Sequence, residues 1–204
     1  PGFDTAGLLT ARVAVPGGRY ETPEKRLAFF DQWQSRIGAL PGVAGVALVD
    51  RLSLLGSGNT GTPAIPGRSA ADATAPDSEL RTVSEGYFRV MGLPVLAGRG
   101  FAASDAPQAT RVVVVNRRFV DEVFGGEDPI GRSLTFAFVD GPLEVVGVVG
   151  DEKAGSLDGR VRPVLYFPWR QDSGPSTSVV VRVTADPRAL AGAPLDARRR
   201  VVIV

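Results

Sequence analysis

Two neighbouring stretches decide the fold of this chain: VSEGYFRVMGLPVLAGRGF (residues 83–101) and VVVVNRRFVDEVFGGEDPIGR (residues 112–132). Each combines an extended segment with a short amphipathic helix, and glycines or prolines mark its corners. Residues 112–115 form a β-branched run typical of a buried strand, and Asn116 is placed to cap the helix that follows. Neither stretch contains a nucleophile–base pair or a metal-ligand cluster. This pattern favours a structural or interaction module over an enzyme.

The segments on either side predict further strands and helices. Residues 8–15 alternate with a period of two, and Thr22 with Pro23 can begin a helix that runs to about Leu40. Its apolar stripe comprises Leu27, Phe30, Trp33, Ile37 and Leu40. The helix that follows Asn116 has an apolar stripe of Phe119, Val120, Val123 and Phe124. Further strands are expected at 43–52, 79–83, 94–96, 133–138, 143–149, 164–167 and 178–184, with a helix at 85–91 closed by Gly92. A last helix can begin at Asp186-Pro187, and the apolar residues 201–204 are either a final strand or the start of a membrane segment. Strand–helix–strand units with further strands predict an α+β fold.

Residues 53–78 differ in composition from the rest of the chain. They are rich in Gly, Ser, Thr, Ala and Pro and contain few large apolar side chains. Such a composition predicts a long surface loop, which is either functional or a variable insertion.

Composition excludes several classes of chemistry. The 204 residues contain no Cys and no His, so a disulfide framework, a Zn–Cys site and a Ser–His–Asp triad are impossible within this chain. Lys25 and Lys153 are the only lysines. The formal net charge of +1 provides no overall field for nucleic acid, and the cluster of Arg198, Arg199 and Arg200 is interpreted as a solvated terminal segment. No window is apolar over the length needed to span a bilayer, and the start at Pro1 without Met suggests an excised domain or a processed product.

Three features invite a chemical interpretation, and each has a structural alternative. The glycine-rich segment 125–131 follows a helix and precedes a strand, so it is interpreted as a turn and not as a phosphate cradle. Asp151 and Glu152 end a strand, but adjacent residues of an extended chain point to opposite faces and do not easily share one cation. Glu144 is interpreted as the solvent-facing residue of an edge strand in preference to a perturbed acid.

The two tryptophans are interpreted mainly as core residues. Trp33 lies in the apolar stripe of the first helix. Trp169 either covers the end of the core or anchors a partner protein, because an aromatic residue next to a polar loop can do either.

Several ordered motifs resemble a known family. These are LLTARVAVP, IGALPGVAGVALV, the two stretches quoted above, LEVVGVVGDEK and PVLYFPWRQ. Together, over about residues 1–190 without the 53–78 segment, they resemble the MacB-like periplasmic core domain of ABC-transporter permeases of the MacB/FtsX type. The nearest likeness is to the second extracytoplasmic domain of large duplicated permeases. The segment 193–204, which contains Pro194, matches less well.

The resemblance implies a porter-like subdomain, formed by residues 1–52 and 143–204, with a smaller α/β subdomain inserted at 53–142. It also implies a domain held between two transmembrane helices on the periplasmic side of the inner membrane. Such proteins act in mechanotransmission: a cytoplasmic ATPase, working through the transmembrane helices, rearranges the periplasmic domains. These domains then engage a membrane-fusion protein, a lipoprotein or another periplasmic client.

The sequence therefore predicts a non-enzymatic, membrane-tethered export domain that binds no nucleic acid. No catalytic, cofactor-binding or metal-binding residue is predicted, and the partner-binding residues are unknown. Two alternatives remain open. One is a small carboxylate-dependent hydrolase that uses Asp151, Glu152 or Glu127, which requires these acids to converge in a cleft. The other is a sensor of a small ligand, which requires a deep apolar pocket.

Overall fold

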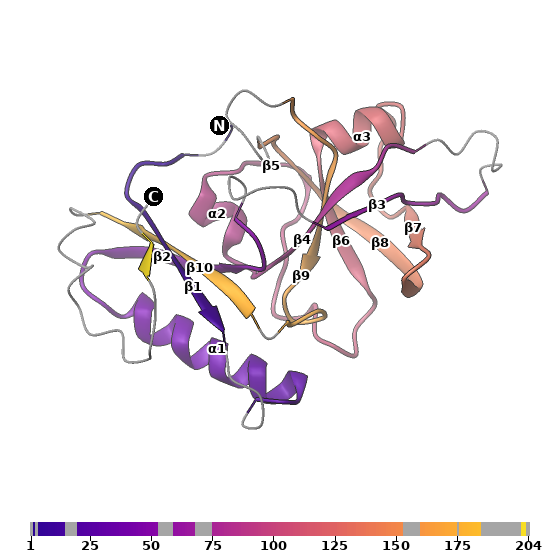
Figure 1. The fold of residues 1–204 in the computed structure, drawn as a ribbon. Helices are drawn as coiled ribbons and strands as arrows, with labels where there is room; N and C mark the ends of the chain where they lie inside the picture. The colour runs from indigo at the N-terminus through magenta and orange to yellow at the C-terminus, as the bar shows by residue number, and fades with distance from the viewer. Residues whose placement is uncertain are drawn as a thin grey trace.

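The computed structural model describes residues 2, 4–14, 20–52, 59–67, 75–152, 160–174, 176–184 and 201–202. They form an open, mixed sheet of 11 strands in the order β11-β1-β10-β2-β4-β9-β6-β8-β5, with β3 paired to β4 and β7 to β8 (Figure 1). The strands are β1 (Leu8–Ala14), β2 (Val43–Val49), β3 (Asn59–Gly61), β4 (Ser78–Val83), β5 (Val95–Gly98), β6 (Val112–Asn116), β7 (Ser133–Phe136), β8 (Val139–Val149), β9 (Val164–Pro168), β10 (Ser176–Val183) and β11 (Val201–Val202). The described helices are α1 (Pro23–Gly38), α2 (Tyr87–Met91) and α3 (Arg117–Val123). The expected α+β class is confirmed.

Helix α1 covers one face of the sheet at the β1–β10–β2 end (Figure 1). It begins as the sequence predicts: the Thr22 hydroxyl accepts a hydrogen bond from the Lys25 amide, and Pro23 occupies the first turn. Its apolar stripe packs against alternate residues of the three strands, which include Leu48 and Val179. The helix ends at Gly38, two residues before the expected Leu40.

Helix α3 covers the other end of the sheet, against β6, β8 and β9. All residues of β6 are buried, and the side chains of Val113 and Val115 face α3 while those of Val112 and Val114 face away from it. The predicted buried strand and the predicted apolar face of α3 are thus confirmed.

Helix α2 packs on the opposite face, against β2 and β10. Residues of β2 and β10 that alternate with those under α1 contribute to this second core, Ala47 and Val180 among them. The helix ends at Gly92, which has a left-handed backbone (φ 69°) and lies so close to Asp4 that a Cβ there would be 3.2 Å from the Asp4 Cβ. The core therefore has two layers of side chains, one on each face of a single sheet.

Among the described strands, the shortest pairing in the sheet is between β2 and β4. These strands pair at one position, Val49 with Val83, whereas β4 continues into β9 over five residue pairs. The division into residues 1–52 with 143–204 and an insertion at 53–142 stays a prediction. Residues 143–149 of β8 and all of β9, which that division places in the first unit, pair with β6 in the described sheet.

Several expectations need correction. The 53–78 segment is not a loop throughout: Asn59–Gly61 forms β3, antiparallel to β4, and Ala64 pairs with Thr135. Residues 53–58 and 68–74 lie outside the described residues, as do Val15, Lys153, the helix expected at Asp186-Pro187 and the three arginines at 198–200. Residues 201–202 are a strand paired with β1, as one of the two hypotheses for the tail holds.

We predict that Asn116→Ala lowers the free energy of unfolding by about 2–3 kcal/mol. The buried Asn116 amide oxygen accepts hydrogen bonds from the backbone N–H groups of Phe119 (3.0 Å) and Val164 (2.9 Å), and its NH₂ group donates to the Arg162 carbonyl (2.9 Å). Alanine leaves these three groups without this partner. Urea unfolding followed by circular dichroism measures the change. Asn116→Asp, which keeps the acceptor, is expected to cost less, and equal losses for both variants would contradict the capping role.

Candidate functional site

The Arg182 side chain connects strand β10 to α2 and to the N-terminal residues 4–6. Its guanidinium donates hydrogen bonds to the Val90 carbonyl at the end of α2 (2.7 Å), the Ala6 carbonyl (2.7 Å), and both the carbonyl (2.8 Å) and the carboxylate (3.0 Å) of Asp4. Because the side chain is only 19% exposed, these charge-assisted bonds are partly shielded from water. We call Asp4, Ala6, Val90 and Arg182 the N-terminal junction.

Backbone contacts reinforce the junction. The Asp4 amide donates to the Met91 carbonyl (3.1 Å), and the Val183 amide donates to the Gly7 carbonyl (2.8 Å). Strand β1 follows directly and pairs with β10 on one side and with β11 on the other. A displacement of residues 4–7 would therefore reach α2 and β10 through direct hydrogen bonds.

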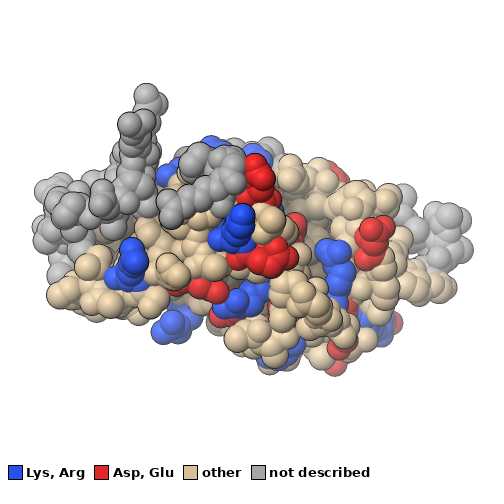
Figure 2. All heavy atoms as spheres, turned by 90° about the horizontal axis from the view of Figure 1, so that it is seen from below, with Lys and Arg blue, Asp and Glu red and all other residues tan. Residues whose placement is uncertain are grey.

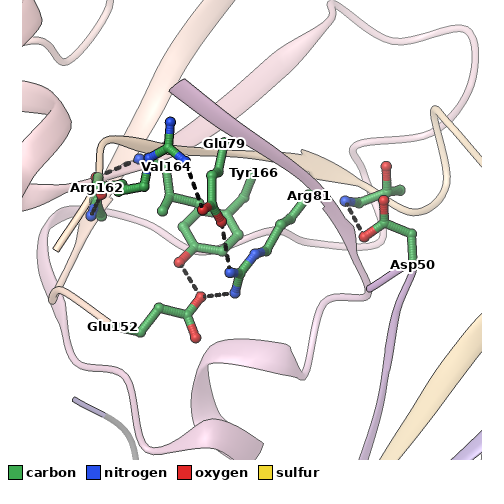
Figure 3. Close-up of polar contacts among 9 residues, drawn as sticks. Asp50, Glu79, Arg81, Glu152, Arg162, Val164 and Tyr166 are labelled. Atoms are coloured by element: carbon green, nitrogen blue, oxygen red, sulfur yellow. Dashed lines mark hydrogen bonds and ion pairs between the residues drawn. The ribbon is translucent and has the colours of Figure 1, made fainter. Parts of the chain in front are cut away.

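A second polar cluster is buried on the same face of the sheet as α2 (Figure 3). Arg81 of β4 donates to Glu152 (2.6 Å) and to Glu79 (3.1 Å), and the Tyr166 hydroxyl donates to the same oxygen of Glu152 (2.6 Å). Arg81 and Tyr166 are register partners in the parallel β4–β9 pair, and Glu79 lies two residues from Arg81 on the same face. Arg162, half-exposed, approaches Glu79 at 3.8 Å. We call Glu79, Arg81, Glu152 and Tyr166 the buried arginine cluster.

Charge and proton positions in this cluster follow from burial and pairing. Burial is the largest single influence and lowers the pKa of Arg81, but Glu152, Tyr87, Tyr166 and Glu79 together more than offset it, so the pKa lies above its ordinary value. Burial, together with the negative charge of Glu152, raises the pKa of the Tyr166 hydroxyl well above its usual range. Arg81 is therefore charged and Tyr166 neutral at physiological pH. The four side chains form a buried network of charge-assisted hydrogen bonds.

The acids proposed for a hydrolase do not converge. Glu152 is fully buried against Arg81, Asp151 accepts a hydrogen bond from the Arg118 amide at the start of α3 (2.9 Å), and Glu127 pairs with Arg132 on the surface (2.8 Å). Asp151 and Glu152 thus point to different partners, as expected from their adjacency. Among the described residues, no group of three or more acidic side chains could hold a metal ion.

The remaining candidates are structural. Trp33 and Trp169 are buried, and the Trp169 ring packs edge-on against Phe30 of α1 (5.4 Å between centroids), which confirms the core interpretation. The segment 125–131 is the predicted turn after α3. Glu144 is half-buried, and its expected place on an edge strand is wrong, because β8 pairs there with both β6 and β7.

In the described part of the chain, charged residues line two of the hollows that open on the surface. The first, of about 430 Å³, lies between α1 and the turn from β4 into α2, with Asp31, Arg89 and Arg170 in its wall. The second, of about 550 Å³, is lined by Asp50, Asp140, Asp172 and Arg111 next to the exposed Phe138. Burial raises the pKa of Asp50 despite its hydrogen bond from the Thr82 amide. Neither hollow is the deep apolar pocket that a sensor of an apolar ligand requires.

The surface shows no field of one sign. Figure 2 shows basic and acidic side chains interspersed over one face of the molecule, in keeping with the net charge of +1. Within the described part of the chain, no helix has the length and apolar character needed to cross a membrane.

Comparison with known proteins places this fold. The model of the MacB-like periplasmic core domain matches residues 4–193. The chain belongs to this family. The family comprises periplasmic, and hence extracytoplasmic, domains of MacB-like ABC-transporter permeases. It is not a family of known enzymes.

The similar proteins of known name include MacB proteins, in agreement with the family match. The chain is 37% identical over 111 residues to the macrolide export ATP-binding/permease protein MacB of Neisseria gonorrhoeae, covering 53% of the chain and 15% of that protein. It is 34% identical over 92 residues to the MacB protein of Aggregatibacter actinomycetemcomitans, covering 45% of the chain and 14% of the relative. The matches therefore span about one seventh of the length of these relatives.

Solved structures share the fold. The periplasmic region of MacB from Actinobacillus actinomycetemcomitans superposes with a TM-score of 0.57 at 21% identity, covering 91% of this chain and 78% of that one. The extracellular domain of the noncanonic ABC-type transporter YknZ from Gram-positive bacteria gives a TM-score of 0.56 at 16% identity, with 90% and 87% covered.

Neither polar cluster was predicted from the sequence. Their members come from segments far apart in the sequence, and Glu79 and Arg81 lie within a strand whose residues are all buried. One signal was present: a Glu and an Arg two positions apart on an extended segment share a face and can pair. Arg182 interrupts the apolar strand β10 in the same way.

Proposed function

We propose that this domain transmits ATP-driven motion from the membrane part of an export permease to a periplasmic partner, a membrane-fusion protein or a lipoprotein. In this proposal a cytoplasmic ATPase acts through transmembrane helices connected to the chain. The domain itself carries out no catalysis. The family relationship supports a periplasmic domain of a permease. The hydrogen bonds of the N-terminal junction support the coupling.

The proposed coupling is mechanical. A signal that enters at residues 4–7 passes to α2 through the Val90 carbonyl and to β10 through Arg182 itself. Helix α2 lies on the central core, and β10 lies between β1 and β2. One partly buried guanidinium therefore links the incoming segment to α2 and to strand β10. Loss of this link is expected to separate ATP hydrolysis from export.

The test replaces Arg182 in the intact permease, assayed with its ATPase. We expect Arg182→Ala to retain ATP hydrolysis while export per ATP hydrolysed falls about tenfold, because roughly 1.4 kcal/mol of coupling is lost. Arg182→Lys keeps the charge but not the branched donor geometry and is expected to be intermediate. Arg12→Ala, on the exposed side of neighbouring β1, is the matched control and is expected to leave both rates unchanged.

Hydrogen exchange on the same variants gives the structural readout. In Arg182→Ala the amides of Asp4 and Val183 are expected to exchange faster, whereas those of β6 are unchanged. Normal export per ATP in a variant whose junction amides are exposed would overturn the proposal.

A further inference from the structure

The second hollow described above, of about 550 Å³, lies on the face of the sheet opposite α2. Val49 and Val83 are register partners in the core under α2, so Leu48 and Thr82, next to them along the chain, face the other side. On that side α1 covers Leu48, and α3 packs against β6, β8 and β9. Thr82 lies between these two cores and lines the hollow, whereas no described residue of α1 or α3 lines it. We call this hollow the acidic hollow.

Thr82 holds two carboxylates in the acidic hollow. Its amide donates to Asp50, which follows β2 (3.1 Å), and its hydroxyl donates to Asp172, which follows β9 (3.2 Å). Asp140 of β8 supplies a third carboxylate, and Arg111 supplies the one positive charge among the described lining residues. Within the described part of the chain, none of these four charged groups forms an ion pair. The lining therefore carries two negative charges in excess.

Charges just outside the acidic hollow leave part of this excess in place. Arg51 follows Asp50 along the chain and is exposed to water, so counting it still leaves one negative charge. Arg81 points to the opposite face, where Glu152 and Glu79 neutralise it. Burial raises the pKa of Asp50, because its carboxylate is poorly solvated, and a bound cation would reduce that cost.

An exposed aromatic ring lies next to these carboxylates. Phe138, between β7 and β8, is 63% exposed, and its ring packs on that of Phe136 (5.3 Å between centroids). A Cβ on Gly61 would lie 2.9 Å from the Phe138 ring, so the ring lies directly against β3. A guanidinium group can stack on such a ring while it pairs with carboxylates. Further apolar surface in the lining comes from Leu80, Val139 and Phe167.

We propose that the acidic hollow binds an arginine side chain of a partner protein. The guanidinium lies against Phe138 and pairs with the carboxylates of Asp140 and Asp172, and its methylene groups cover the apolar part of the lining. A lysine fits less well, because an ammonium group neither stacks nor pairs in a bidentate manner. The inference rests on the proposed function for the existence of a partner, and it adds the chemistry by which that partner is recognised.

The experiment titrates the ¹⁵N-labelled 204-residue chain with the peptide Ac-SGRGS-NH₂ and follows amide shifts by NMR. Matched peptides carry lysine or citrulline in place of arginine, and citrulline keeps the shape of arginine without its charge. We expect the arginine peptide to shift the amides of Thr60, Asp140 and Asp172 with a Kd of about 5 mM. The lysine peptide should bind about threefold more weakly, and the citrulline peptide should give no saturable shift.

Substitutions in the acidic hollow test the two kinds of contact. Asp140→Asn combined with Asp172→Asn is expected to weaken the arginine peptide about tenfold, and Phe138→Leu about threefold. The control is Asp121→Asn, an exposed acid of α3 that does not line the hollow and is expected to leave the Kd unchanged. Circular dichroism establishes that each variant is folded.

Three outcomes would overturn the proposal. They are equal binding of the arginine and citrulline peptides, an unchanged Kd in the doubly substituted variant, and shifts at Asp140 that grow with protein concentration alone. The last would make a second copy of the chain the occupant. The titration needs no ATPase, so its failure leaves the export test on Arg182 unaffected, and a failure of that test leaves the peptide affinity unaffected.

Discussion

Replacing Arg81 with methionine is expected to lower the free energy of unfolding by about 3–5 kcal/mol, the usual cost of removing one partner from a buried ion pair. Glu152 is fully buried and Glu79 is 2% exposed, so neither carboxylate can regain water without opening the sheet. Methionine fills much of the volume of arginine but supplies no positive charge. Urea unfolding at neutral pH, followed by circular dichroism, measures the loss.

Two further variants separate charge from packing. Adding Glu152→Gln and Glu79→Gln to Arg81→Met removes the uncompensated charges, and this triple variant is expected to be more stable than Arg81→Met alone. Arg162→Met is the matched control: its side chain is 40% exposed and 3.8 Å from Glu79, so its expected cost is under about 1 kcal/mol. If Arg81→Met and Arg162→Met unfold at the same urea concentration, the buried cluster does not stabilise the fold.

This cluster illustrates what the sequence could not predict. Besides the local Glu79, Arg81 pairs with Glu152, 71 positions away. Glu152 also accepts a hydrogen bond from Tyr166 of β9, which becomes a neighbour of Arg81 only through parallel pairing of β4 and β9. Local patterning contains no information about that pairing. Helix α1 is the opposite case, because its cap, its first-turn proline and its apolar stripe are all local, and the structure reproduces them.

The sequence did not predict strand β3, for a related reason. A Gly- and Ser-rich segment has low intrinsic strand propensity, but Asn59–Gly61 pairs with β4 because β4 offers a free edge there.

The second large effect is expected at Gly147 of β8, where alanine should cost about 3 kcal/mol or more. A Cβ at this position would lie 3.0 Å from the Arg99 carbonyl carbon and closer still to its oxygen. The obstacle is backbone that is held in place: the Arg99 amide donates to the Val146 carbonyl (2.9 Å), and its side chain pairs with Asp105 (2.8 Å). The clash therefore cannot be relieved by a side-chain rotation.

Gly38→Ala is the matched control, with the opposite expected sign. Gly38 is the last residue of α1, and a Cβ there would lie 4.0 Å from the nearest atom, a methyl carbon of Val46. Alanine restricts the unfolded chain without a clash, so the free energy of unfolding should rise by about 0.4–1 kcal/mol. Urea midpoints of the two variants test the pair. Because β5 pairs with β8 alone among the described strands, loss of stability in Gly147→Ala should begin with faster amide exchange in residues 95–99. Unchanged exchange there, with an unchanged midpoint, would contradict the close crossing of Arg99 over β8.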